Sequence, residues 1–202
     1  MRKATRLVAT FFGFLAGIAG LEHGYFEILQ GNLRPAGVMF PSWGADICDP
    51  AKLWHACEPA MSILPNFLVS GILTVLLSLG IMAWSVWFLQ RKYGGWGLIL
   101  LSIVLLLVGG GFFPPLIGLI GGAAGTQIHR PLGGQPGSAT RFAAKLWPWP
   151  LVLLVGWLLA QFPIGYFFND GLKSIMGWAL LFIVTFLPFS VYVGYARDAV
   201  SK

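Results

Sequence analysis

Charge is what this chain has least of. Lys, Arg, Asp and Glu make up only 10% of the 202 residues, whereas 57% are hydrophobic. A soluble domain carries about 25% charged residues, and a chain this poor in charge cannot cover a folded surface with polar groups. The composition therefore excludes an ordinary soluble domain and predicts that lipid covers the hydrophobic side chains.

The sequence motifs of several enzyme chemistries are also absent. There is no Walker loop, no Rossmann glycine pattern, no Cys-x-x-Cys and no Gly-x-Ser-x-Gly. The 3 histidines are far apart in the predicted topology, since His23 is near one face, His129 near the other and His55 in a loop, which disfavours a haem held by two of them. A dinuclear carboxylate centre would need Glu-x-x-His motifs on several helices, and the chain does not repeat one. The sequence predicts no metal site and identifies no cofactor.

Long apolar runs are present, and they predict six transmembrane helices. Five reach the ~17–25 residues needed to cross ~30 Å of hydrocarbon. The fourth, after Pro114-Pro115, is glycine-rich and would be only about 20 Å long. The predicted spans are residues 7–29, 63–89, 96–113, 116–128, 151–168 and 175–195, with an outer loop at 30–58 and a cytoplasmic interfacial segment at 129–147. We expect one all-α membrane domain, residues 1–202, built as a six-helix bundle.

The basic residues predict how this bundle is oriented. If all six helices cross, ten Lys and Arg lie on the cytoplasmic side and three lie outside, in agreement with the positive-inside rule. The ten are Arg2, Lys3, Arg6, Arg91, Lys92, Arg130, Arg141, Lys145, Arg197 and Lys202, and the three are Arg34, Lys52 and Lys173. A fourth segment that dips in and returns would give six inside against seven outside. We therefore expect both termini in the cytoplasm of a multi-pass cell-membrane protein, and membrane orientation rather than nucleic-acid binding explains the net charge of +6.

The two cysteines, Cys48 and Cys57, both fall in the predicted outer loop. An oxidising compartment outside the membrane favours a disulfide between them. Metal binding with His55 as a third ligand is the alternative, but the spacing matches no zinc pattern. A pair of free thiols is also compatible with the sequence.

Glycines and ionisable residues share the first predicted span. Gly13, Gly17, Gly20 and Gly24 follow one helical stripe, which predicts close approach of another helix. The ionisable or polar residues near the outer end of this span are Glu22, His23, Glu27 and Gln30. Ionisable groups inside a membrane are expensive and indicate a functional site, here for binding or proton exchange. The structural alternative is a hydrogen-bonded knot with Arg34, Lys52 or Asn66 that only fixes helix packing.

A polar ribbon begins just before the second predicted span and continues along it. It consists of Glu58, Ser62, Asn66, Ser70, Thr74 and Ser78, at every fourth residue. Glu58 and Asn66 would extend the outer binding site, and Ser62, Ser70, Thr74 and Ser78 would line a hydrated path below it. The alternative is helix packing, because small polar side chains are favoured where membrane helices touch and can bond back to i−4 carbonyls. The triple glycine Gly109-Gly110-Gly111 before Pro114-Pro115 is likewise compatible with a gate or with a tightly packed hairpin.

The segment Gly24–Gly44, GYFEILQGNLRPAGVMFPSWG, resembles part of the acetate-uptake transporters, which are six-span proteins of similar length. The resemblance covers about a tenth of the 202 residues, and the Asn-Pro-Ala-Pro signature of that family is missing. It favours transport slightly.

Two classes of function therefore remain, with a third behind them. The first is a small-solute, ion or proton channel or transporter with an acidic and histidine site near the outer face; histidine titrates near physiological pH, so His23 could couple protonation to passage. The second is a non-catalytic membrane subunit or scaffold, in a homo-oligomer or a larger complex, whose glycine faces dock partner helices. The third is a membrane enzyme that uses the outer carboxylates and histidine.

Overall fold

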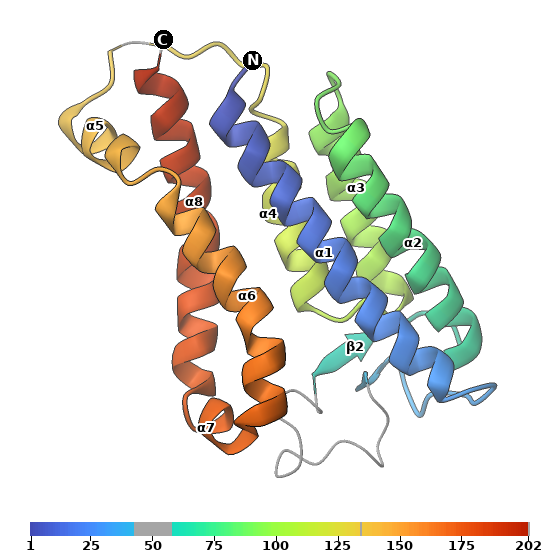
Figure 1. Ribbon diagram of the computed structural model, residues 1–202. Helices are drawn as coiled ribbons and strands as arrows, with labels where there is room; N and C mark the ends of the chain where they lie inside the picture. The colour runs from blue at the N-terminus through green and yellow to red at the C-terminus, as the bar shows by residue number, and fades with distance from the viewer. Residues whose placement is uncertain (43–57, 134, 202) are drawn as a thin grey trace. The chain divides into compact units, whose positions relative to one another are not determined.

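The computed structural model describes residues 1–42, 58–133 and 135–201, and it is mainly helical (Figure 1). The described residues contain eight helices and one antiparallel pair of short strands, β1 and β2. The elements are α1 (Lys3–Leu29), β1 (Met39–Pro41), β2 (Pro59–Met61), α2 (Phe67–Trp87), α3 (Gly94–Val108), α4 (Phe113–Gly125), α5 (Ser138–Lys145), α6 (Trp149–Phe167), α7 (Asn169–Ser174) and α8 (Met176–Val200). This arrangement fits the predicted all-α class.

Four of these helices, α1, α2, α6 and α8, are long and apolar enough to cross a membrane. That finding indicates a membrane protein. The other two predicted spans form shorter apolar helices, α3 with 15 residues and α4 with 13. At ~1.5 Å per residue these helices are roughly 22 and 20 Å long, less than the ~30 Å of a hydrocarbon core.

The third predicted span, residues 96–113, differs from α3, which runs from Gly94 to Val108. α3 ends at Val108 because Gly109 adopts the left-handed conformation (φ +119°) that commonly ends a helix, and Gly111 is left-handed as well (φ +72°). A new helix starts at Phe113, with proline in its first turn, where the missing N–H costs nothing. The predicted boundary of the second span, residue 63, is also early. α2 begins after Asn66, whose side chain accepts a hydrogen bond from the backbone N–H of Val69.

The chain divides into two compact units, which are described separately. The first consists of Met1–Val8 and Gln127–Lys202, and in it α5 and α6 both pack against α8. Ala143 and Ala144 are the buried face of α5, against Val193 and Ala196 of α8, and Leu146 packs against the same cluster. α7 forms the short connection between α6 and α8 (Figure 1).

The second unit, Ala9–Thr126, holds the rest of α1 together with α2, α3, α4 and the two strands. α3 packs against both α2 and α4. The strands lie at the end of the unit where α1 ends and α2 begins, and Phe40, Ala60 and Phe67 form a small buried cluster there. The rings of Phe40 and Phe67 meet edge to face, with centroids 4.8 Å apart.

Candidate functional site

Along its predicted glycine stripe, α1 packs closely against α2, α3 and α4. A Cβ atom added to Gly13 would meet Ser85 and Leu98, and one added to Gly17 would meet Met82 and lie 2.8 Å from the carbonyl oxygen of Ser78. Gly20 similarly faces Ser78, and Gly24 lies against Gly71 and Val75. From the opposite direction, Gly118 and Gly121 of α4 approach Ala16 and Phe12 of α1. The polar residues at the end of α1 are therefore enclosed by neighbouring helices.

Glu27 is the most enclosed of these polar residues, with 0% of its surface exposed. Its Oε2 accepts a hydrogen bond of 2.5 Å from the Ser70 hydroxyl of α2. Its Oε1 has no hydrogen-bond partner among the residues that the structure describes. A buried carboxyl group with one oxygen unpaired is costly, and such groups call for an explanation.

His23 lies one helical turn before Glu27 and is 3% exposed. Its Nδ1 is 2.8 Å from the hydroxyl of Ser42, just after β1, and its Nε2 is 3.4 Å from Oε2 of Glu58, just before β2. The Ser42 hydroxyl in turn donates to the carbonyl oxygen of Glu58, at 2.8 Å. The Glu58 side chain is 31% exposed, so this chain of contacts joins the buried imidazole to a carboxylate that reaches solvent.

The hydrogen bonds of Ser42 decide which nitrogen of His23 carries a proton. Because the single hydroxyl hydrogen of Ser42 goes to the Glu58 carbonyl, Nδ1 of His23 must be the donor toward Ser42. Nε2 is then left facing the Glu58 carboxyl group. That contact is favourable only when a proton lies between the two groups, either on the imidazole or on the carboxyl.

The turn between α3 and α4 forms one wall of this region. A Cβ atom at Gly109 would collide with both carboxyl oxygens of Glu27, and one at Gly111 would collide with the imidazole ring of His23. Both glycines also have positive φ. Glycine is needed here for two reasons, a left-handed backbone and close approach to the two ionisable side chains. The sequence contained this signal in the Gly109-Gly110-Gly111 run but could not indicate which residues it touches.

Most residues of the polar ribbon bond to other parts of the protein. Ser70 bonds Glu27, while the Thr74 hydroxyl donates to the carbonyl oxygen of Val108 at 2.9 Å. Ser62 precedes α2 and pairs with Val108 in an isolated antiparallel bridge. Ser78 is buried against Gly20, and its hydroxyl has no partner among the described residues. Only Ser70, Thr74 and Ser78 of the ribbon therefore lie on α2. Glu58, Ser62 and Asn66 all precede its first residue.

The remaining predicted site residues are placed around this cluster. Gln30 donates through Nε2 to the carbonyl oxygens of Ser42, at 3.0 Å, and Phe26, at 3.3 Å, so it supports the turn that holds Ser42. Glu22 is half-buried and has a polar interaction. Asn66 caps α2 and donates to the Asn32 side chain. Arg34 is exposed, and among the described residues His23 and Glu27 contact Ser42, Ser70 and Glu58 rather than Arg34 or Asn66. The disulfide partners Cys48 and Cys57, like Lys52 and His55, lie outside the described residues, so the disulfide stays a prediction.

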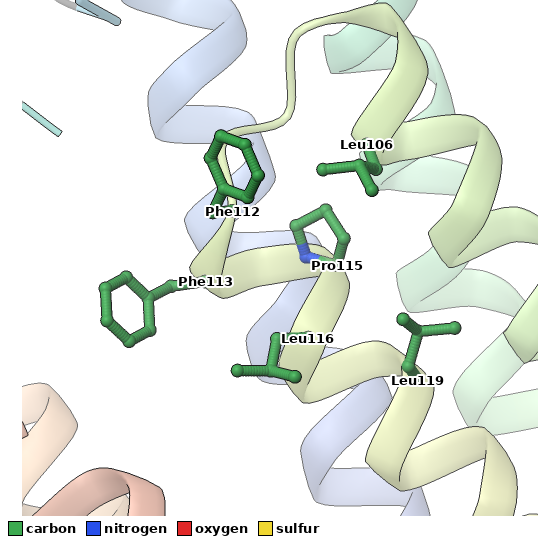
Figure 2. Close-up of a pocket in the computed structure, with 6 residues that line it drawn as sticks. All are labelled: Leu106, Phe112, Phe113, Pro115, Leu116 and Leu119. Carbon is green, nitrogen blue, oxygen red and sulfur yellow. The ribbon is translucent and has the colours of Figure 1, made fainter. Parts of the chain in front are cut away.

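An apolar cavity of about 250 Å³ lies beside the same turn. Figure 2 shows its six lining side chains, which come from α3, from the turn and from the start of α4. They are Leu106, Phe112, Phe113, Pro115, Leu116 and Leu119. None of them is polar, so this cavity does not extend the cluster around Glu27.

The described residues contain no group of three or more His, Cys, Asp or Glu side chains that could hold a metal ion. Comparison of the chain with protein-family models, with curated proteins and with solved structures finds no match. The resemblance of Gly24–Gly44 to the acetate-uptake transporters is therefore not supported by these comparisons, and the function has to be inferred from the site itself.

Proposed function

We propose that this membrane protein binds a proton or a small cation at Glu27, near the outer face of a cell membrane, as the binding step of an ion or proton transport cycle. The observation that carries the proposal is the carboxyl group of Glu27, which is wholly buried and has one oxygen without a protein partner. A buried carboxyl group is stable as a neutral acid or beside a cation, and not as an isolated charge. Either state means that Glu27 takes up a positive ion.

The contacts of His23 provide a route by which protons reach the site from solution. The Glu58 side chain is partly exposed, and its Oε2 lies 3.4 Å from His23 Nε2. Histidine exchanges protons readily near neutral pH. His23 and Glu27 are four residues apart on α1, a spacing that places side chains on the same face of a helix. In this proposal Glu58 and His23 pass protons between the outer solution and Glu27.

Infrared difference spectroscopy of the purified, reconstituted protein tests the binding step directly. A pH step changes the protonation of carboxyl groups and alters the carbonyl stretching band of each protonated acid. We expect a band of this kind that is lost in Glu27→Gln and retained in Asp170→Asn, a matched carboxyl-to-amide change at an exposed position of α7. Identical difference spectra for the parent protein and Glu27→Gln would show that Glu27 does not exchange protons and would refute the proposal.

Proton flux into vesicles tests the transport step separately. Vesicles containing the parent protein and a pH-sensitive dye should respond to an imposed gradient, and Glu27→Gln should abolish that response while Asp170→Asn leaves it unchanged. Glu58→Gln should slow the flux, because the outer member of the relay is lost. A carboxyl band without any flux in the parent protein would leave a proton-binding site but would count against transport.

The second candidate function is a non-catalytic membrane subunit, which would assemble as a homo-oligomer or with other proteins. The observation in its favour is the packing of α2 against the glycine stripe of α1, where Ser78 and Ser85 touch Gly20 and Gly13 instead of lining an open path. The same serines would then be structural. Under this hypothesis the purified protein shows neither the Glu27-dependent band nor any flux, and copurifying subunits are found after mild extraction.

A further inference from the structure

A second polar site lies in the other compact unit, where the start of α1 meets the segment after α4. A cavity of about 530 Å³ opens there, within the range of small-molecule binding pockets. It is lined by Met1, Arg2, Lys3, His129, Arg130, Pro131, Leu132, Asp198 and Ser201. Basic side chains dominate its lining, and all of it belongs to the unit formed by residues 1–8 and 127–202.

Arg2 is the central basic residue of this cavity, because it is held in place and is 7% exposed. Its backbone N–H donates to the carbonyl oxygen of Ile128 at 3.0 Å, and one terminal nitrogen, Nη2, donates to the carbonyl oxygen of Pro131 at 3.2 Å. The guanidinium group lies over the Tyr195 ring, 4.8 Å from its centroid. Its Nε has no hydrogen-bond partner among the described residues. This donor is buried and unused, and the guanidinium group that carries it belongs to a residue that lines the cavity.

The one acidic residue among the lining residues, Asp198, is already engaged by the protein. Its Oδ1 accepts from the backbone N–H of Ala4 at 2.9 Å, and its Oδ2 accepts from the N–H and the hydroxyl of Thr5, at 2.8 and 2.7 Å. These bonds satisfy the free amides in the first turn of α1, where a negative charge is stabilising. Both oxygens of Asp198 are thus occupied, and the lining carries the three positive charges of Arg2, Lys3 and Arg130 against this one negative charge.

We propose that this cavity binds a phosphate group, on either an anionic lipid headgroup or a free phosphate ester. Guanidinium groups pair with phosphate oxygens through several hydrogen bonds, and basic pockets between membrane helices bind anionic headgroups on the cytoplasmic side. The predicted topology places the first residues of α1 and Arg130 on that side. Arg2 supplies the fixed donor of the site, and Lys3 and Arg130 supply exposed charges at its rim.

Binding of two probes tests this site and separates the two sources of phosphate. Inorganic phosphate is titrated calorimetrically into the full-length protein in an uncharged maltoside detergent. Separately, the protein is reconstituted into phosphatidylcholine vesicles that contain a low fraction of phosphatidylglycerol. It is then purified again, and the phosphatidylglycerol that stays bound to it is measured. Loss of one charged hydrogen bond should weaken binding about tenfold in Arg2→Gln and in Arg130→Gln. Because Arg130 is exposed, its variant tests the site even if Arg2→Gln does not fold.

Arg141→Gln is the matched control, since it removes one charge from an exposed residue of α5 that does not line the cavity. Its binding of both probes should equal that of the parent protein. Phosphate binding that depends on Arg2 and Arg130 would identify free phosphate as a sufficient ligand, whereas retention of phosphatidylglycerol alone would identify the lipid. The proposal is overturned if neither probe binds, or if Arg130→Gln and Arg141→Gln reduce binding equally.

Discussion

Ser70 and Ser78 have the same side chain on the same buried face of α2, but their surroundings give them opposite energetic roles. The hydroxyl of Ser70 donates to Glu27, whereas that of Ser78 is buried without a partner among the described residues. Removing the first leaves a second unsatisfied oxygen on Glu27. Removing the second eliminates an unsatisfied group.

We therefore expect Ser70→Ala to destabilise the protein by about 1–3 kcal/mol and Ser78→Ala to be neutral or slightly stabilising. Thermal unfolding of both variants in the same detergent measures the difference. Equal losses of stability would mean that the two hydroxyl groups have equivalent surroundings, contrary to the hydrogen bonds described above.

Gly109 is constrained both by its backbone and by its neighbour. Its φ of +119° strains any residue with a Cβ atom, and that atom would collide with the Glu27 carboxyl group. We expect Gly109→Ala to lower the free energy of unfolding by more than about 1 kcal/mol, the usual cost of the backbone effect alone. Gly80→Ala is the control, since Gly80 is on α2 with open space around it and an ordinary φ. An unchanged melting temperature in Gly109→Ala would contradict the left-handed turn.

At the scale of whole elements, the end of α3 is unusual for a membrane protein, because its last carbonyl groups need partners from other parts of the chain. The last carbonyl groups of a helix have no partner within it, and lipid supplies none. Here Leu107 accepts from the N–H of Ile63 at 2.9 Å, and Val108 accepts from the Thr74 hydroxyl. Residues just after β2 and on α2 therefore satisfy the end of a helix that is shorter than a hydrocarbon core is thick.

Contact between α1 and α2 depends on glycine from both helices. A Cβ atom on Gly71 of α2 would lie 2.7 Å from both the carbonyl oxygen of Gly24 and the N–H of Ile28. These are backbone atoms, which cannot turn aside, so Gly71→Ala must separate the helices. We expect a destabilisation of about 1–3 kcal/mol, typical of overpacking. The exposed Gly80→Ala on the same helix again serves as the control, and similar melting temperatures for the two variants would contradict close packing of α1 on α2.

At the scale of the whole molecule, composition and hydropathy predict the class well, and they predict the site only in part. Four of the predicted spans correspond to helices long enough to cross a membrane, because a run of apolar residues is a property of the sequence alone. The partners of Glu27 and His23 could not be predicted, because Ser42, Glu58 and Gly109 are remote in sequence and are brought together only by tertiary packing. Asn66 was predicted to belong to this site, but its side chain caps α2 and donates to Asn32 instead.

The number of membrane crossings depends on α3 and α4, and single cysteines can determine it. In a background of Cys48→Ser and Cys57→Ser, we expect a membrane-impermeant maleimide to label Gly171→Cys from outside and to label Ala139→Cys only after the membrane is opened. This outcome follows from the positive-inside rule, which places the basic residues of α5 in the cytoplasm. If α4 instead dips into the membrane and returns to the outer side, where α3 emerges, both of these accessibilities reverse, while Lys92→Cys, which precedes α3, stays inaccessible from outside in either topology. Reversal at both positions would mean five crossings, three before Gly109 and two after it, and would place Arg130, Arg141 and Lys145 outside, against the positive-inside rule.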